Sequence, residues 1–130
     1  MRVLFVEDNE VNRRVVKEML TAGGIEMFEA EDGAAGLEMI EQNDYDLILM
    51  DLRMPGMDGM TAIRHIRARS DGKATVPVIV VTADAGSTID ADCKDAGADE
   101  VILKPVSMTS LYDTIGQLLA RRGGDGVLVA

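Results

Sequence analysis

The sequence has 130 residues, the size of a single domain, and 47% of them are apolar, which is enough for a buried core. The 23 Asp and Glu residues outnumber the 13 Lys and Arg residues and give a formal net charge of -10. Because this charge opposes binding to phosphate backbones, we expect no nucleic-acid partner. One cysteine and one histidine exclude an internal disulfide and a Cys/His zinc site, and they favour a cytoplasmic protein.

The first apolar run, residues 3–6, follows one positive residue and is followed at once by acidic residues. This pattern is unlike a signal peptide or a membrane span, so we expect no membrane insertion. Similar short runs recur along the chain and predict five strands. Most of them lack polar alternation, which is typical of strands buried on both faces of a parallel sheet. The predicted strands are residues 3–6, 27–30, 47–50, 78–81 and 101–103.

Apolar residues at helical spacing predict a helix after each strand. The fourth helix, residues 87–95, has the thinnest apolar stripe and several aspartates of poor helix propensity. The predicted inward positions are Val11, Val15 and Met19, then Leu37 and Ile40, then Ile63 and Ile66, then Ile89 and Cys93, and finally Leu111, Ile115 and Leu118. Predicted N-caps are Asp32, Asp58 and Ser107, and predicted C-terminal glycines are Gly23 and Gly97.

Five repeats of strand and helix predict an α/β fold, an open parallel sheet with helices on both faces. We expect one domain over residues 1–120 and a flexible tail over residues 121–130. Because no further domain follows the last helix, we expect output through partner proteins. In this architecture, ligands bind at the carboxyl ends of the strands.

Chemically distinct polar residues follow four of the predicted strands. Carboxylates that converge there repel each other unless a cation neutralises them, and Mg2+ prefers such oxygen ligands. A lysine and a threonine at the same edge suit a bound phosphoryl group. Each residue alone could be an ordinary loop or capping residue, but their joint occurrence at one edge favours a site. They are Glu7 and Asp8, Asp51, Thr82 and Ala83, and Lys104 with Pro105.

These segments resemble the receiver (response regulator) domain of two-component signalling. The resemblance spans residues 2–119 and implies a flavodoxin-like (βα)5 fold with strand order 2-1-3-4-5. It rests on Val-Glu-Asp-Asn at 6–9, Leu-Met-Asp-Leu-Arg-Met-Pro-Gly-Met-Asp-Gly at 49–59, Val-Thr-Ala at 81–83 and Leu-Lys-Pro at 103–105.

The resemblance implies a phosphorelay module in which Asp51 accepts a phosphoryl group from a phosphohistidine. It implies that Mg2+ is bound by Asp8, Asp51 and the carbonyl of Arg53, and by Glu7 through water. Lys104, Thr82 and the amide of Ala83 are then the donors to the phosphoryl oxygens. A cis bond is implied between Lys104 and Pro105, and we expect Arg53 and Asp84 to pair across the site and slow hydrolysis of the acyl phosphate.

The implied partner is a histidine kinase or a histidine phosphotransfer domain, and the domain is expected to be a monomer or weak dimer. A downstream protein would bind the face made by helix 87–95, strand 101–103 and the last helix. Val101 stands where the family has a switching aromatic residue, so we predict that residues 83–96 reorder instead. Both a stand-alone regulator and a segment of a hybrid histidine kinase remain open.

Two other functions deserve comparison. An aspartate-nucleophile phosphatase on a similar sheet would carry a second acid two residues after the nucleophile, and Arg53 stands there instead. A flavin-binding electron carrier would need a hydroxyl-rich loop after the first strand and aromatic residues around the ring. This chain has Glu7, Asp8 and Asn9 in that loop, and only two Tyr, two Phe and no Trp.

Overall fold

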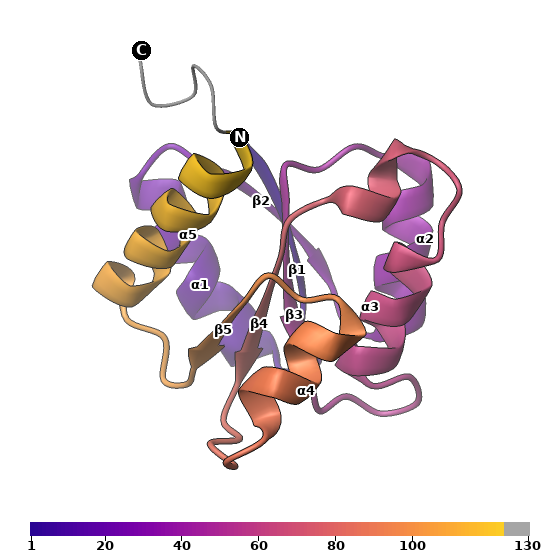
Figure 1. Cartoon of the computed structure of the whole chain (residues 1–130). Coiled ribbons are helices and arrows are strands. Elements are labelled where there is room, and N and C mark those ends of the chain that lie inside the picture. The colour runs from indigo at the N-terminus through magenta and orange to yellow at the C-terminus, as the bar shows by residue number, and fades with distance from the viewer. Residues whose placement is uncertain (124–130) are drawn as a thin grey trace.

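The computed structural model describes residues 1–123, which form alternating strands and helices (Figure 1). The strands are β1 (Arg2–Val6), β2 (Glu26–Ala30), β3 (Leu47–Asp51), β4 (Val78–Thr82) and β5 (Glu100–Leu103). The helices are α1 (Glu10–Ala22), α2 (Gly33–Gln42), α3 (Gly59–Arg67), α4 (Ile89–Ala96) and α5 (Met108–Gly123), with a short 3-10 helix η1 (Gly72–Thr75) before β4.

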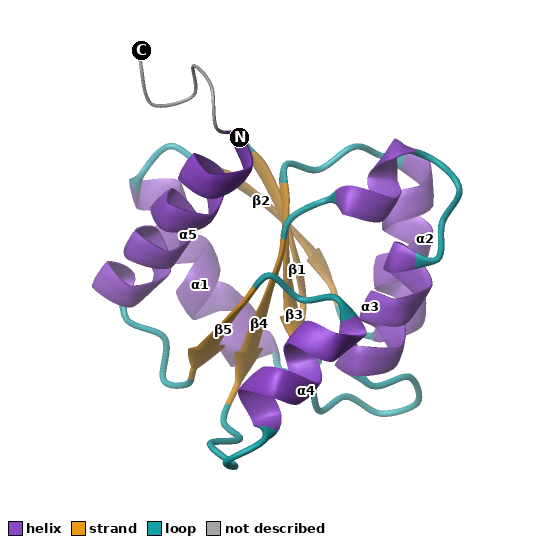
Figure 2. Ribbon diagram, in the orientation of Figure 1, coloured by secondary structure: helices purple, strands orange, loops and turns teal. Residues whose placement is uncertain are grey.

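The five strands form one parallel sheet in the order β2-β1-β3-β4-β5, as predicted. Helices α1 and α5 cover one face, and α2, α3 and α4 cover the other (Figures 1 and 2). The fold is therefore the flavodoxin-like α/β class. All strands point the same way, so their carboxyl ends share one edge, where the arrowheads of β4 and β5 lie at the bottom of Figure 1.

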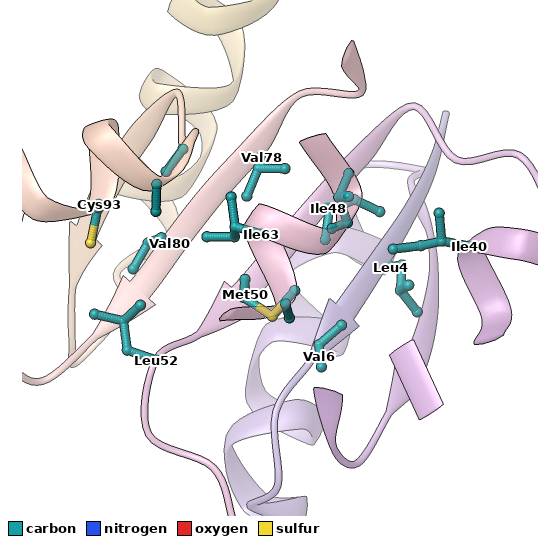
Figure 3. Packing of buried hydrophobic residues seen from close by; sticks show 14 of the residues in the cluster. Leu4, Val6, Ile40, Ile48, Met50, Leu52, Ile63, Val78, Val80 and Cys93 are labelled. Carbon is teal, nitrogen blue, oxygen red and sulfur yellow. The ribbon is translucent and has the colours of Figure 1, made fainter. Parts of the chain in front are cut away.

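Each face of the sheet has its own apolar core, because alternate strand residues point to opposite sides. Leu4, Ile48 and Val80 pack with α2, α3 and α4, as Figure 3 shows. Phe5 and Leu49 point to the other side and pack with α1 and α5. All five residues of β3 and all five of β4 are buried, which explains why their sequences lack polar alternation.

The predicted inward face of α1 is confirmed at Met19, which packs against the core, and wrong at Val11 and Val15. Val16 and Leu20 are buried in this helix, whereas Val11 and Val15 are 59% and 43% exposed. Val16, Met19 and Leu20 share one face of the helix, and the Arg13 guanidinium donates to the carbonyl of Glu7 at 2.7 Å. Burial of that face leaves Val11 and Val15 on the surface.

The predicted helix ends are confirmed. The carboxylates of Asp32 and Asp58 accept from the third residues of α2 and α3, and Ser107 Oγ accepts from the amide of Ser110. Gly23 and Gly97 end α1 and α4. In contrast, Thr88 before α4 makes no side-chain capping bond.

Helix α5 extends past the boundary expected at residue 120. Arg121 in its last turn pairs with Glu100, and Arg122 pairs with Asp99 at 3.0 Å, so these interactions hold the turn against β5 and the loop before it. The other residues of the expected tail, 124–130, lie outside the described residues. Within residues 1–123, none of the helices combines the length and the apolar character that a membrane crossing requires.

Candidate functional site

A polar residue lies at the carboxyl end of each of four strands. Asp51 and Thr82 are the last residues of β3 and β4, while Glu7 and Lys104 directly follow β1 and β5. Glu7, Asp51 and Thr82 are 1%, 4% and 1% exposed, and they are the buried polar or charged residues among those the structure describes. Buried polar groups at one edge of an otherwise apolar sheet indicate a functional site rather than packing.

The three acids predicted to bind a cation lie together. Glu7, Asp8 and Asp51 each offer a carboxylate oxygen, and these oxygens lie within 4.8 Å of one another. Asp8 is exposed, so the cluster opens to solvent. Oxygen donors, a mixture of buried and accessible carboxylates, and an open side suit a hard divalent ion that keeps part of its water shell.

Lys104 is the cation that faces this cluster. Its Nζ donates to Glu7 Oε1 at 2.7 Å and lies 3.4 Å from Asp51 Oδ1. Burial lowers the pKa of Lys104, but the hydrogen bond to Glu7 and the charge of Asp51 outweigh burial and raise it overall. The ammonium group is therefore charged at neutral pH. The peptide bond between Lys104 and Pro105 is cis, as the resemblance implied.

Thr82 and Ala83 lie at the end of β4, the strand that pairs with the end of β3 beside Asp51. The Thr82 hydroxyl oxygen accepts from the amide of Asp84 at 3.1 Å, and the Thr82 carbonyl accepts from the amide of Lys104 at 2.8 Å. The second bond ties the end of β4 to the residue that carries the site's cation. Ala83 is exposed, so this stretch of backbone borders the open side of the site.

Arg53 and Asp84 pair across the mouth of the site, as expected from the sequence. Arg53 Nη2 lies 2.9 Å from Asp84 Oδ2, and the Arg53 side chain is 78% exposed. The pKa of Asp84 is lowered, first by a hydrogen bond from the amide of Gly86 and then by the hydrogen bond from Arg53. The pair links the loop after β3 to the loop after β4.

Sequence reasoning missed the residues that hold Glu7 in place. Asn12 Nδ2 donates to Glu7 Oε1 at 3.2 Å, and the amide of Asn9 lies 3.3 Å from Oε2. Arg13 binds the carbonyl of the same residue. The only signal in the sequence was the run of polar residues after β1, which predicted a loop and the start of a helix without its contacts.

The comparisons with known proteins agree with this geometry. The sequence model of the response regulator receiver domain matches residues 3–116. The chain belongs to this family. Among curated relatives, the receiver domain is 33% identical over 122 residues to the chemotaxis protein CheY-3 of Vibrio cholerae, covering 93% of each chain. The chain is also 33% identical to the sensory/regulatory protein RpfC of Xanthomonas campestris. That match covers 91% of this chain but only 16% of RpfC.

Solved structures extend the comparison to the site. The receiver domain of the Pseudomonas aeruginosa sensor histidine kinase PA1611 is 34% identical, has a TM-score of 0.83, and covers 92% of this chain and 97% of that chain. In that structure a magnesium ion is coordinated in the active site cleft. The receiver domain of the Francisella response regulator 1452 has a TM-score of 0.84 at 27% identity, with 93% and 98% coverage. The chain is thus a receiver domain of two-component signalling, like CheY-3 and the receiver domains of hybrid kinases.

Proposed function

We propose that Asp51 is the phosphoacceptor of this receiver domain. A carboxylate oxygen of Asp51 attacks the phosphorus of a phosphohistidine, the O–P bond forms as the P–N bond breaks, and the imidazole nitrogen leaves with the bonding electron pair. The observation that carries this proposal is the meeting of the buried Asp51 with two further acids and Lys104 at the carboxyl edge of the sheet. Phosphoryl transfer needs mainly positioning and neutralisation of charge, and this arrangement supplies both.

Mg2+ fits the donor set of the site. Asp8, Asp51 and the backbone carbonyl of Arg53 are the proposed direct ligands, and Glu7 is the proposed ligand through water. A bound Mg2+ would neutralise charge on the phosphoryl oxygens. Support comes from the three carboxylate oxygens within 4.8 Å of one another and from the magnesium ion described for the Pseudomonas relative.

The donors around the phosphoryl group come from β4 and β5. Lys104, already 3.4 Å from Asp51, is the proposed ion-pair partner of a phosphoryl oxygen. The Thr82 hydroxyl and the amide of Ala83 are the proposed hydrogen-bond donors to the other phosphoryl oxygens. For this, the hydroxyl turns its hydrogen toward the phosphoryl group while its oxygen continues to accept from the amide of Asp84.

The domain also loses its phosphoryl group by slow hydrolysis, and we assign the control of that rate to Arg53 and Asp84. Their ion pair spans the mouth of the site, where water must approach the acyl phosphate. A dedicated aspartate-nucleophile phosphatase is not favoured, because it needs an acid two residues after the nucleophile. Arg53 stands at that position and its guanidinium is turned to Asp84.

The phosphodonor is a histidine kinase or a histidine phosphotransfer domain, and we place its docking at α1. Val11 and Val15 form an exposed apolar strip there, flanked by the exposed cations Arg14 and Lys17. A cavity of about 180 Å3 beside the strip is lined by Val15 and Lys104, among other residues. A partly apolar helix that bears the phosphohistidine fits this surface.

A downstream protein would bind the other side of the site. Leu103 of β5 and Met108 of α5 are 50% and 45% exposed, and Val101 is partly exposed beside them. These residues lie on the face made by α4, β5 and α5. The free Cys93 and the need for a phosphohistidine donor support a cytoplasmic site of action.

The acceptor is tested by incubating the protein with acetyl phosphate and Mg2+ and measuring intact mass. Wild type should gain one phosphoryl group, and Asp51→Asn should gain none. Asp113→Asn, a substitution of an exposed aspartate on α5, is the matched control and should label like wild type. Labelling of Asp51→Asn at the wild-type rate would overturn the assignment.

The docking surface is tested by the ratio of two rates. Val15→Glu should slow transfer from a phosphohistidine protein much more than transfer from acetyl phosphate, because only the protein donor covers α1. Leu103→Glu places the same charge on the downstream face and should leave that ratio unchanged. Equal ratios for the two variants would remove α1 as the docking surface.

A further inference from the structure

Asn12 is placed by the first turn of α1 beside the acceptor site. Its backbone amide donates to the capping oxygen Oδ1 of Asn9 at 3.0 Å, which fixes the position of its Cα. Its side chain then reaches back and donates from Nδ2 to Glu7 Oε1 at 3.2 Å. The same oxygen also accepts from Lys104 at 2.7 Å. One carboxylate oxygen is thus shared by a neutral donor and a cation.

This sharing matters because Glu7 is 1% exposed. When Lys104 pairs with a phosphoryl oxygen on Asp51, the hydrogen bond from Lys104 to Glu7 weakens, because one ammonium group then serves two acceptors. A buried carboxylate whose hydrogen bond weakens is destabilised, and this opposes the pairing of the lysine with the phosphoryl group. Asn12 and Lys104, the two side chains that donate to Glu7 Oε1, also line the same cavity of about 180 Å3 beside α1.

We propose that Asn12 is a positioning residue that keeps Glu7 hydrogen-bonded when Lys104 pairs with the phosphoryl group. The inference rests on the proposed acceptor role of Asp51. Asn12 touches neither the phosphoryl group nor Asp51, and it acts through Glu7. It therefore favours the phosphorylated state over the free state. In the free state the 2.7 Å bond from Lys104 still holds Glu7, so Asn12 contributes little to the affinity for Mg2+ there.

The test separates these two affinities. Mg2+ alone is titrated by calorimetry, and beryllofluoride, a stable mimic of the phosphoryl group, is then titrated at saturating Mg2+. Asn12→Leu removes the donor at similar volume, and Asn12→Gln keeps an amide donor. Hydrogen bonds to charged groups contribute about 1.5–3 kcal/mol, so Asn12→Leu should bind beryllofluoride roughly tenfold more weakly or worse. Its affinity for Mg2+ alone should stay within about twofold of wild type, and Asn12→Gln should recover most of the loss.

Asn12→Ala serves as a second variant if the leucine does not fold, and thermal unfolding checks both. Wild-type affinity of Asn12→Leu or Asn12→Ala for beryllofluoride overturns the inference. A parallel loss of Mg2+ affinity also overturns it, because Asn12 would then act on the free site. If wild type itself binds no beryllofluoride and gains no phosphoryl group at Asp51, the proposed function fails, and this outcome is distinct from failure of the Asn12 variants alone.

Discussion

Gly59, the first residue of α3, packs directly against the end of the strand that carries the acceptor. A Cβ added at this position would collide with the carbonyl oxygen of Asp51 and would lie 2.9 Å from Cα of Leu52. Both neighbours belong to the backbone, and the amide of Gly59 donates to the carbonyl of Leu52 at 2.9 Å. Rotation of a side chain therefore cannot relieve the collision, and Gly59→Ala must displace either α3 or the end of β3.

The size of the effect follows from that geometry. Overpacking of a tight site costs about 1–3 kcal/mol, and we expect the upper part of this range because backbone atoms must move. Displacement of the Asp51 backbone also moves its carboxylate relative to Glu7 and Lys104. A misplacement of about 1 Å slows a positioned reaction by roughly 100-fold, so phosphorylation of Gly59→Ala should be at least about tenfold slower than that of wild type.

Urea unfolding without Mg2+ measures the first effect, and acetyl phosphate labelling followed by mass spectrometry measures the second. Gly116→Ala is the matched control, because Gly116 lies in α5 with nothing within 4 Å of an added Cβ. There, the better helix propensity of Ala should stabilise the domain by up to about 1 kcal/mol. The reasoning is refuted if Gly59→Ala unfolds and labels like wild type.

Three other predictions concern the loops and helix ends around the site. Exposed ion pairs such as Arg53–Asp84 contribute up to about 1 kcal/mol, so Arg53→Ala should speed loss of the phosphoryl group by up to about fivefold. The intact mass, followed over time, measures this rate. An unchanged half-life of the phosphorylated protein would show that the pair does not control hydrolysis. Asp58→Ala should destabilise the domain by about 1 kcal/mol at pH 7. The hydrogen bond from the amide of Thr61, together with the charge of Arg64, lowers the pKa of Asp58 below its usual 3.8. The stabilisation by this cap is therefore fully present above pH 3.8. The gap between wild type and variant in urea unfolding should close as pH falls below 3.8 through the lowered pKa, and a gap that persists in acid would refute the capping argument. Beryllofluoride with Mg2+ should change hydrogen exchange in residues 83–96, above all before α4, because Thr88 provides no side-chain cap; unchanged exchange there would exclude this segment as the switch.

The sequence allowed prediction of most of the fold, because it depends on short-range signals. Fully apolar runs such as residues 47–50 and 78–81 predict strands buried on both faces, and alternation with helices predicts a parallel sheet. The strand order itself came from the family resemblance. The phase of α1 could not be predicted, because two apolar pairs in this helix have the same i, i+4 spacing, Val11 with Val15 and Val16 with Leu20. Only the second pair is buried.

Some residues of the candidate site could likewise be predicted from the sequence, and others could not. Glu7, Asp51 and Lys104 could be predicted because each adjoins a buried strand, and strand ends of a parallel sheet meet at one edge. The hydrogen bond of Asn12 to Glu7 could not, because it depends on how α1 is rotated. The role of Gly59 was also hidden, since the close approach of α3 to the Asp51 carbonyl appears only when both elements are in place.

The two ends of α4 differ in how they are attached to the rest of the domain. At the C-terminal end, far from the acceptor site, Arg67 donates to the carbonyl of Gly97 at 2.8 Å and to Asp99 at 3.1 Å. Asp99 also accepts from Arg122, so the end of α4 is tied to α3 and α5. The start of α4 is attached differently: the Thr88 side chain caps no backbone amide, and its hydroxyl bonds to Asp92 of the same helix rather than to a neighbouring element. A change at the acceptor site therefore meets little resistance at the start of α4 and much at its end. We therefore predict that α4 moves at its start about the end anchored by Arg67, and that a local change at the site reaches the face that α4 shares with β5 and α5.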